Sequence, residues 1–379
     1  MKVPEDLLEK LTTLRRKLHS IPELSGREKQ TVTILNQFVR NYGPDKIIPE
    51  IGKSGLAYIY KGAKEGPTIL LRADMDAVAI HETSEIHWAS IHPGVSHKCG
   101  HDGHMAILAG VAALLFEQRP EKGRIVLLFQ PSEENGKGAF EVINDSRFSA
   151  IEPDVAIALH NLPGFEMGTL LLREGVMAMA SKGIRFVFQG IDSHASEPEK
   201  GISPLPVMTA FIDFVENMKA QLQSRAVITT CHMQLGEPSF GVNPGQGVIH
   251  LTVRTETASA MQDVCDELIM QAGNLAQKSG VMLKTDYHDE FPETKNNKDL
   301  IQEIQNAALK SRIKVATLSK SFKWSEDFGY FTRDYKGALI GLGSGTNQPP
   351  LHHPLYDFPD EAIEPGLRIL FEILKDYCF

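Results

Sequence analysis

The segment Thr68-Ile-Leu-Leu-Arg-Ala-Asp-Met-Asp76 places a short apolar run directly before two carboxylates. Continuous apolar runs of this length are typical of strands that are covered on both faces of a sheet. The same pattern recurs at Arg124–Phe129, Val155–Leu159 and Gly337–Gly341. Helical stretches such as His104–Gln118 lie between the runs. We therefore predict an α/β domain, in which ligands bind beyond the carboxyl ends of the strands.

The regions on either side of these strands have other patterns. Leucines recur at helical spacing from Leu7 to Leu18, which predicts helices over Pro4–Tyr42 with a break at Pro22. The middle of the chain predicts the order β-α-β-β-α-β, at residues 182–190, 205–222, 227–235, 247–254, 258–279 and 281–287. This order is the split βαβ pattern of ferredoxin-like folds. We expect a smaller α+β domain, residues 181–291, to interrupt an α/β domain of residues 1–180 and 292–379.

The composition is that of a folded globular protein. Of the 379 residues, 42% are hydrophobic and 23% charged, which argues against a disordered, collagenous or small disulfide-built chain. The net charge of −9 argues against nucleic acid or an anionic membrane as a partner. The four cysteines form no Cys-x-x-Cys pair, the start lacks a signal-peptide pattern, and the apolar run Met105–Phe116 is too short to span a membrane. We expect a cytoplasmic protein without a membrane anchor.

The segment Cys99-Gly-His-Asp-Gly-His104 concentrates side chains that bind metals. A thiol, two imidazoles and a carboxylate at this spacing offer ligands of mixed hardness. The alternative is a polar loop in which Asp102 caps the helix that begins near His104. The metal interpretation gains support from other parts of the chain, which carry further potential ligands.

These further ligands follow predicted strands or lie in a late proline-rich loop. They are Asp74, Asp76, Glu133-Glu134, His160 and His352-His353. Adjacent carboxylates such as Glu133 and Glu134 repel each other and lose solvation when buried, and a cation would offset both effects. Neighbouring side chains in an extended segment point to opposite sides, so one glutamate could bind metal while the other contacts a water. Each cluster alone could be an ordinary solvated loop, but together they favour a metal site.

Two other kinds of site fit the sequence poorly. Gly341-Leu-Gly-Ser-Gly-Thr346 resembles a dinucleotide-binding loop, but it lacks the final glycine and Gln348-Pro-Pro350 follows instead of a helix. The Gly-x-Ser-x-Gly motif of serine hydrolases does not occur, and Ser193 is adjacent to His194, which is poor geometry for activating the serine. Metal-dependent chemistry remains the better-supported interpretation.

Segments throughout the chain resemble the metallopeptidase family that includes aminoacylase and carboxypeptidase G. The branch is that of the indole-acetyl-amino-acid amidohydrolases and hippurate hydrolases. The matching segments are Arg15-Arg-Lys-Leu-His19 with Pro22-Glu-Leu-Ser25, Arg72-Ala-Asp-Met-Asp-Ala77, Cys99-Gly-His-Asp-Gly-His104, Phe129-Gln-Pro-Ser-Glu-Glu134, Ala158-Leu-His160, Ser325-Glu-Asp-Phe328 and Leu351-His-His-Pro-Leu-Tyr-Asp-Phe358. The resemblance implies a phosphorylase/hydrolase-like catalytic domain with a mixed central sheet. It also implies that residues 181–291 form a lid and dimerisation domain.

The resemblance further implies roles for individual residues. Two divalent ions per subunit, zinc or manganese, would be held by Cys99, His101, Glu134, His160 and His352. Glu133 corresponds to the general acid and base, and Asp76 to an aspartate that supports the site. In the lid, His194 corresponds to a histidine that reaches the partner subunit's active site. Asn243 and Arg254 correspond to lid residues that hold the carboxylate of the substrate.

The implied activity is metal-dependent hydrolysis of the amide bond of N-acyl amino acids by a homodimer that pairs through its lid. One alternative is a dipeptidase or carboxypeptidase with the same two-metal site. Another is a non-catalytic metal- or ligand-binding relative, against which the intact Glu133 argues. Two departures from the family pattern concern the lid: Pro198 precedes Glu199 rather than a histidine, and Asn243 precedes Pro-Gly-Gln rather than Val-Ile-Pro. The preferred acyl group and amino acid are therefore not implied.

Overall fold

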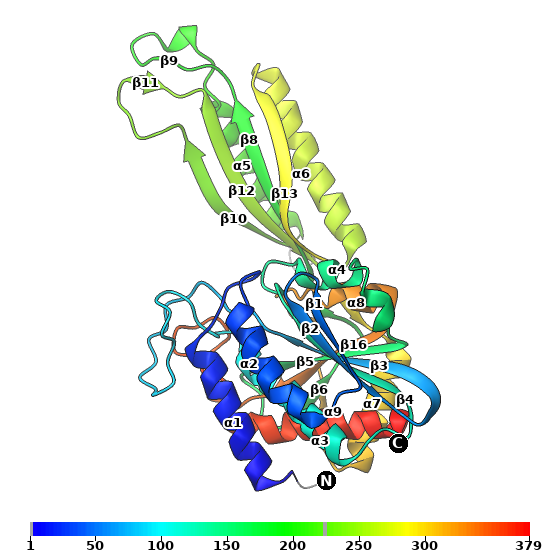
Figure 1. Ribbon diagram of the computed structural model, residues 1–379. Helices are drawn as coiled ribbons and strands as arrows, with labels where there is room; N and C mark the ends of the chain where they lie inside the picture. Colours follow the sequence, from blue (N-terminus) through cyan, green and yellow to red (C-terminus); the bar gives the residue numbers. More distant parts are fainter. Residues whose placement is uncertain (1–2, 223–225) are drawn as a thin grey trace. The chain divides into compact units, whose positions relative to one another are not determined.

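The computed structural model describes residues 3–222 and 226–379. It divides into two compact units (Figure 1). The first comprises the chain up to Met177 together with Thr294–Ser321 and Glu326–Phe379, and the second comprises Ala178–Glu293 and Phe322–Ser325. All of residues 292–379 were expected in the first domain, whereas Phe322–Ser325 group with the second unit. Backbone contacts explain this, since Met179 N donates to the carbonyl oxygens of Phe322 (3.1 Å) and Trp324 (3.2 Å).

The first unit is built on a mixed eight-stranded sheet in the order β1-β2-β4-β3-β5-β16-β6-β15. The strands, in this order, are Lys46–Ile51, Gly55–Lys61, Lys122–Gln130, Lys64–Asp74, Val155–Leu162, Lys336–Gly343, Leu170–Leu172 and Val315–Thr317. The four central strands, β4, β3, β5 and β16, run parallel to one another. The pairs β1–β2, β2–β4 and β16–β6 are antiparallel. The four strands predicted from apolar runs are these central strands, which confirms the α/β class.

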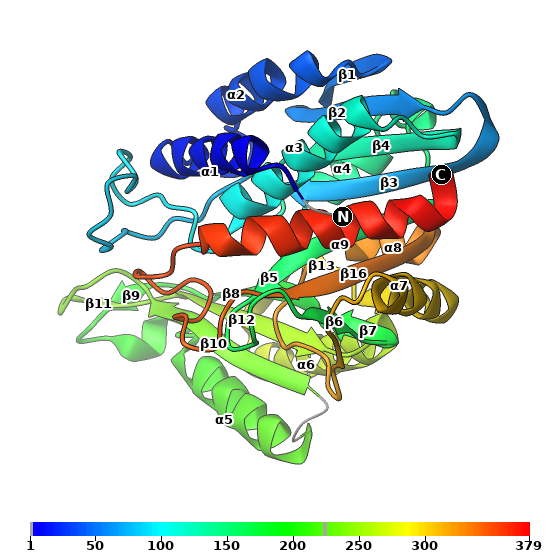
Figure 2. The same ribbon diagram turned by 90° about the horizontal axis from the view of Figure 1, so that it is seen from below.

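Helices cover the sheet and one of them is almost fully buried. The longer helices are α1 (Glu5–Ser20), α2 (Lys29–Val39), α3 (His101–Glu117), α7 (Lys298–Lys310) and α9 (Ile363–Cys378). Shorter elements are η1 (Arg40–Tyr42), α4 (Gly138–Ile143), η2 (Phe148–Ala150), α8 (Gly329–Asp334), η4 (Asp360–Ala362) and the paired strands β7 (Gly175–Ala178) and β14 (Thr294–Asn296). α3 packs against α1, α9 and β3 (Figure 2). Because α3 is apolar all round, packing on every side suits it.

The second unit contains a four-stranded antiparallel sheet in the order β10-β12-β8-β13. Its main elements, in chain order, are β8 (Ala180–Gln189), α5 (Leu205–Leu222), β10 (Ala226–Leu235), β12 (Gln246–Thr255), α6 (Ala258–Lys278) and β13 (Met282–Phe291). This is the predicted β-α-β-β-α-β order. Apolar side chains of the sheet and of α5 and α6 form one core. A two-stranded pair, β9 (Ser193–His194) with β11 (Val242–Asn243), and the 3-10 helix η3 (Pro198–Lys200) complete the unit.

Across residues 3–222 and 226–379, no helix is both long enough and apolar enough to cross a membrane.

Candidate metal centre and active site

Three parallel strands and one helix bring the predicted ligands to one edge of the sheet. β3 ends at Asp74, β4 ends at Gln130, and β5 carries His160 near its end. α3 begins at His101, directly after Gly100, whose φ is 91°. A Cβ at Gly100 would lie 2.7 Å from Asn161 Oδ1, so this position between two predicted ligands requires glycine. Parallel strands end at a common edge, which explains why segments distant in sequence meet here.

The five predicted metal ligands lie close together. The donor atoms of Cys99, Glu134 and His352 are all within 4.8 Å of one another, as are those of His101, Glu133 and Glu134. Glu134 Oε1 lies 3.7 Å from His101 Nε2 and 3.5 Å from His352 Nε2. Cys99 Sγ lies 3.6 Å from His160 Nε2. Glu134 therefore belongs to both groups.

Hydrogen bonds to backbone carbonyls set the orientation of two of these imidazoles. His101 Nδ1 donates to the carbonyl oxygen of Asp76, and His160 Nδ1 donates to that of Asn161, each at 2.8 Å. A carbonyl oxygen only accepts, so Nδ1 of each ring carries a hydrogen. In its neutral form, each ring would present the lone pair of Nε2, that of His101 toward Glu134 and that of His160 toward Cys99, as metal-binding histidines do.

The donor set fits divalent cations. His101 Nε2 and Glu134 Oε1 are buried and have no hydrogen-bond partner among the described residues. The pKa of the Cys99 thiol is raised well above its ordinary value, mainly by burial and next by the charges of Glu134 and Glu133. Although burial alone would lower the pKa of His101, the charge of Asp74 raises it to about 10. Buried polar atoms without partners and closely spaced carboxylates are unfavourable, and cations would relieve both.

Asp76 holds the two neighbouring glutamates by their backbone. Its Oδ1 accepts from Glu133 N (3.1 Å) and its Oδ2 from Glu134 N (3.0 Å) and Ser25 Oγ (2.6 Å). Ser132, just before them, has a φ of 57°, a left-handed conformation that is uncommon for residues other than glycine. Asp76 thus contacts the backbone that carries Glu133 and Glu134, and its supporting role stays a prediction.

Three further charged residues near Glu133 were not among the predicted site residues. Arg72, fully buried, donates to Asp74 (2.7 Å), to Glu326 (2.9 Å) and to Asp327 (2.9 Å). Carboxylate oxygens of Glu133, Glu326 and Asp327 lie within 4.8 Å of one another. Burial and then the charge of Glu326 raise the pKa of Glu133 well above its ordinary value, and Arg72 offsets this only in part. All three residues lie in segments that match the family, Arg72–Ala77 and Ser325–Phe328. This match is the sequence signal by which they could have been recognised as site residues.

His104 lies beside the ligands but its ring is occupied by other partners. The atoms of Asp74, His101, His104 and His160 form a buried group within 4.8 Å. His104 Nδ1 donates to Asp74 Oδ1 at 2.6 Å, and its Nε2 contacts the amide of Asn161. With both nitrogens engaged, His104 packs against the site rather than offering a free donor atom.

The predicted lid residues His194, Asn243 and Arg254 all lie in the second unit. β9 carries His194 and β11 carries Asn243, and these strands pair, with Asn243 opposite Ser193. Arg254 lies at the other end of β12, where it donates to Ser325 Oγ at 2.9 Å. At about 3.3 Å per residue, Gln246 and Arg254 are separated by about 26 Å along the strand. The structure therefore does not bring Asn243 and Arg254 together within one lid.

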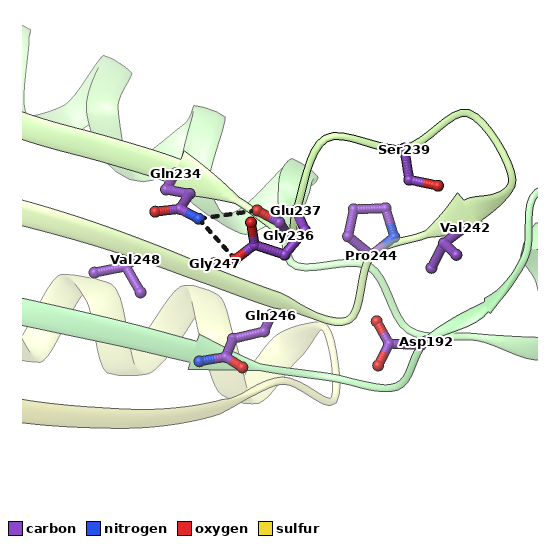
Figure 3. A pocket seen from close by; sticks show the side chains of 10 residues that line it. All are labelled: Asp192, Gln234, Gly236, Glu237, Ser239, Val242, Pro244, Gln246, Gly247 and Val248. Atoms are coloured by element: carbon purple, nitrogen blue, oxygen red, sulfur yellow. Dashed lines mark hydrogen bonds between the residues drawn. The ribbon is translucent and has the colours of Figure 1, made fainter.

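A pocket of about 590 Å³ adjoins the loop that carries Asn243 (Figure 3). Figure 3 shows Asp192 and Pro244 on its wall, with Gln234 bonded to Gly236 and Glu237. Asp192 Oδ1 accepts from Gly245 N at 2.6 Å and so fixes one end of this loop. The residues that line the pocket all belong to the second unit and include none of the predicted metal ligands.

Comparison with known proteins gives matches over nearly the whole chain. The N-acetyl-L-cysteine deacetylase of Bacillus subtilis (strain 168) is 32% identical over 374 residues, covering 97% of this chain and 88% of the relative. The N-acetyldiaminopimelate deacetylase of Bacillus licheniformis is 27% identical over 367 residues, covering 96% of this chain and 97% of the relative. Both relatives are deacetylases of amino acid derivatives.

A solved structure agrees with these matches. The YXEP protein of Bacillus subtilis, a dinuclear metal-binding peptidase from the M20 family, superposes with a TM-score of 0.82 at 26% identity, covering 98% of each chain. Residues 70–376 match peptidase family M20/M25/M40. The predicted family resemblance and the predicted class of enzyme, a metal-dependent amidohydrolase, are both confirmed. This chain belongs to peptidase family M20/M25/M40.

Proposed function

We propose that this chain hydrolyses the amide bond of an N-acyl amino acid, with Glu133 as general acid and base. The observation that carries the proposal is the convergence of the five expected ligands beside Glu133. These ligands are Cys99, His101, Glu134, His160 and His352, and they would hold two divalent ions. When bound, such ions would polarise the amide carbonyl and lower the pKa of a nearby water.

The residues of the chain would carry the proton transfers. Glu133 is buried, with 5% of its surface exposed, and its position is set by Asp76. In its ionised form it can take a proton from the attacking water. It can then give that proton to the leaving nitrogen, which is favourable because burial raises its pKa. Glu326, Asp327 and Arg72 would tune this proton affinity by their charges.

The identity of the ions and of the substrate follows from the ligands and from the relatives. Cys99 favours softer ions such as zinc, whereas glutamate and histidine also accept manganese. Relatives that deacetylate N-acetylcysteine and N-acetyldiaminopimelate support a small acylated amino acid as the substrate. Arg254 would bind the free carboxylate through the paired donors of its guanidinium.

His194 is suited to stabilise the oxyanion from a neighbouring subunit. Its Nδ1 accepts from Ser196 N at 3.1 Å, so the neutral ring carries its hydrogen on Nε2. The side chain is exposed, and Nε2–H is therefore available as a donor to an oxyanion. Because Asn243 lies beside Ser193 while Arg254 lies at the far end of β12, one lid cannot place both on a single substrate. A homodimer in which His194 and Asn243 act in trans and Arg254 acts in cis resolves this separation.

A turnover assay tests the proposed function and its alternatives. The metal-loaded protein is incubated with N-acetyl amino acids, hippurate, and dipeptides that have free amino termini. We expect hydrolysis of the acylated amino acids, and loss of that activity after chelation. Preferential hydrolysis of the dipeptides would instead support a peptidase. Metal binding without turnover of any of these compounds would support a binding protein.

A further inference from the structure

A chain of alternating buried charges lies behind the segment Cys99–His101. Lys98 and Asp102 flank this segment in sequence. Lys98 Nζ donates to Glu82 Oε1 at 2.5 Å, and the same oxygen accepts from His19 Nε2 at 3.1 Å. His19 Nδ1 donates to Asp102 Oδ2 at 2.8 Å. We call Lys98, Glu82, His19 and Asp102 the ion-pair clamp, because it ties both flanks of the segment to α1.

His19 is the central member of this clamp and carries a positive charge. Both of its ring nitrogens face carboxylate oxygens, so both must donate, and the ring is an imidazolium. Its side chain has no exposed surface. Although burial would lower the pKa of His19, the charge of Asp102 raises it to about 9. A neutral side chain could not donate to both carboxylates in the same geometry.

The clamp also reaches the loop that carries His352. Lys98 Nζ donates to the carbonyl oxygen of Tyr356 at 2.6 Å, and the carbonyl oxygen of Lys98 accepts from His352 N at 2.8 Å. Arg15, one turn before His19 on α1, donates to Asp102 (3.3 Å) and to Asp357 (2.6 Å). His352 itself has a φ of 65°, a conformation that surrounding contacts must maintain. Two separate ligand-bearing segments are thus bonded to one helix.

The charges in the clamp balance without a further cation. Donor atoms of His19, Asp102 and Asp357 lie within 4.8 Å of one another and could in principle hold a metal. The guanidinium of Arg15 and the ammonium of Lys98 already pair with the carboxylates of this region. Buried ion pairs contribute little net stability, because desolvation opposes their attraction. Their main effect here is on the geometry of the residues they hold.

We propose that His19 is a positioning residue of the metal centre, which fixes the backbone on both sides of Cys99 and His101 and thereby sets the affinity for metal. The hydrogen bonds of the His19 ring go to Asp102 and Glu82, neither of which is a proposed metal ligand. The inference rests on the proposed function, because it takes Cys99 and His101 as metal ligands.

Cobalt(II) binding to purified full-length protein tests the proposal. The variants are His19→Gln, Glu82→Gln as a milder second change, Leu11→Ala as a control and Cys99→Ala as a ligand control. Leu11 lies in the core on the same helix, so its truncation weakens packing without touching the clamp. Affinity is measured by competition with a chelator, and Cys99 ligation by the thiolate-to-cobalt charge-transfer band.

We expect His19→Gln to bind cobalt about 10–100-fold more weakly, with a weakened or shifted charge-transfer band, as when supporting partners of metal ligands are removed. Glu82→Gln should change both readouts in the same direction. Leu11→Ala should melt at a lower temperature yet keep the wild-type affinity and band.

Four results would overturn the clamp or its basis, and they are distinguishable. Wild-type affinity and band in both His19→Gln and Glu82→Gln, with loss of the band in Cys99→Ala, would refute the clamp and leave the proposed function intact. If Leu11→Ala lost as much cobalt affinity as His19→Gln, the loss would reflect lower stability of the fold and not the ion-pair clamp. An extra equivalent of metal in the wild type that disappears in His19→Gln would make the clamp itself a metal site. An unchanged band in Cys99→Ala would refute the proposed metal centre.

Discussion

Two adjacent glutamates at the end of β4 have different surroundings, and this difference decides their proposed roles. Glu134 Oε1 faces the ring nitrogens of His101 and His352, whereas Glu133 lies with Glu326 and Asp327. Asp76 accepts from the backbone N–H of both glutamates and so fixes which side each occupies. A shift of this segment by one residue would put one glutamate in the place of the other and Ser132 or Asn135 in the vacated place.

The pair Glu133→Gln and Glu134→Gln tests this division. Each substitution keeps the size of the side chain and removes its charge. We expect Glu133→Gln to keep its metal content and to lose about 10²–10⁴-fold in kcat, because general acid–base transfer is removed. Glu134→Gln should lose metal as well as activity. Metal analysis together with kinetics checks this, and equal loss of metal in both variants would contradict the assignment.

Alkylation tests Cys99 as a ligand. A thiolate bound to metal is shielded from alkylating reagents, and removing the metal frees the sulfur. We expect Cys99 to be modified faster after chelation, as measured by mass spectrometry of its peptide. Cys265, which is buried in the second unit, provides an internal control whose rate should not change. Identical rates for Cys99 with and without chelator would argue against ligation.

At the scale of elements, the sequence predicted best what has strong local patterns. The central strands and α3 have long apolar runs, and the predicted elements of the second unit lie within a few residues of those observed. β1 was missed because Pro49 interrupts its apolar pattern, and an edge strand tolerates proline where a central strand does not. β6 and β15 are three residues long, too short to show a period.

In the candidate site too, residues in strong local patterns were predicted and residues that meet only through the fold were missed. The proposed ligands lie near strand ends or in short segments rich in metal-binding side chains, and both patterns can be recognised in the sequence. The contacts of Arg72 with Glu326 and Asp327 join residues more than 250 positions apart. The family resemblance marked the segments that carry these residues, but it did not show that they pair, because burial and partner choice are set by the fold. The ion-pair clamp was missed for the same reason, although Arg15–His19 belonged to a matching segment.

The clamp predicts a pH dependence of stability for the metal-free protein. His19 has a folded-state pKa of about 9 against an ordinary value of 6.5. Its charge therefore stabilises the fold fully below pH 6.5, and this contribution is lost as the pH rises through 9. The neighbours of His19 that carry charge or titrate are Arg15, Glu82, His97, Lys98, Asp102 and Asp357. Their pKa values are lowered for Glu82 and Asp102, so both stay ionised between pH 6.5 and 9. Burial lowers the pKa of His97 and keeps it neutral over the same range.

Urea unfolding of the wild type and of His19→Gln at several pH values measures this contribution. We expect the difference in unfolding free energy between them to narrow by about 1–3 kcal/mol from pH 6 to pH 9.5. A difference that stays constant or widens over this range would show that His19 is not held as an imidazolium.

At the scale of the whole molecule, the second unit carries the residues expected to complete the active site. His194 and Asn243 lie on the β9–β11 pair, and Arg254 lies at the opposite end of β12. In the proposed symmetric dimer, the two ends of this strand would serve different active sites. Pairing through the lid would also cover exposed sheet edges, which otherwise invite aggregation.

Mixing two inactive variants tests the dimer. Subunits with His194→Ala are exchanged with subunits carrying Glu133→Gln. If His194 acts in trans, each heterodimer has one site that lacks both groups and one site that is intact. We expect recovery of up to about half of the wild-type activity per heterodimer. A strictly monomeric protein, or a mixture that stays inactive despite demonstrated exchange, would rule out action in trans.

Metal titration tests most directly the central claim that this chain is a two-metal amidohydrolase. The protein is stripped with chelator, and zinc or manganese is returned in known amounts while hydrolysis of an N-acetyl amino acid is followed. We predict that stripped protein is inactive and that activity returns as two ions bind per chain, with tight two-ion binding lost in Cys99→Ala. Full activity in the stripped protein, or maximal activity with a single bound ion, would contradict the account.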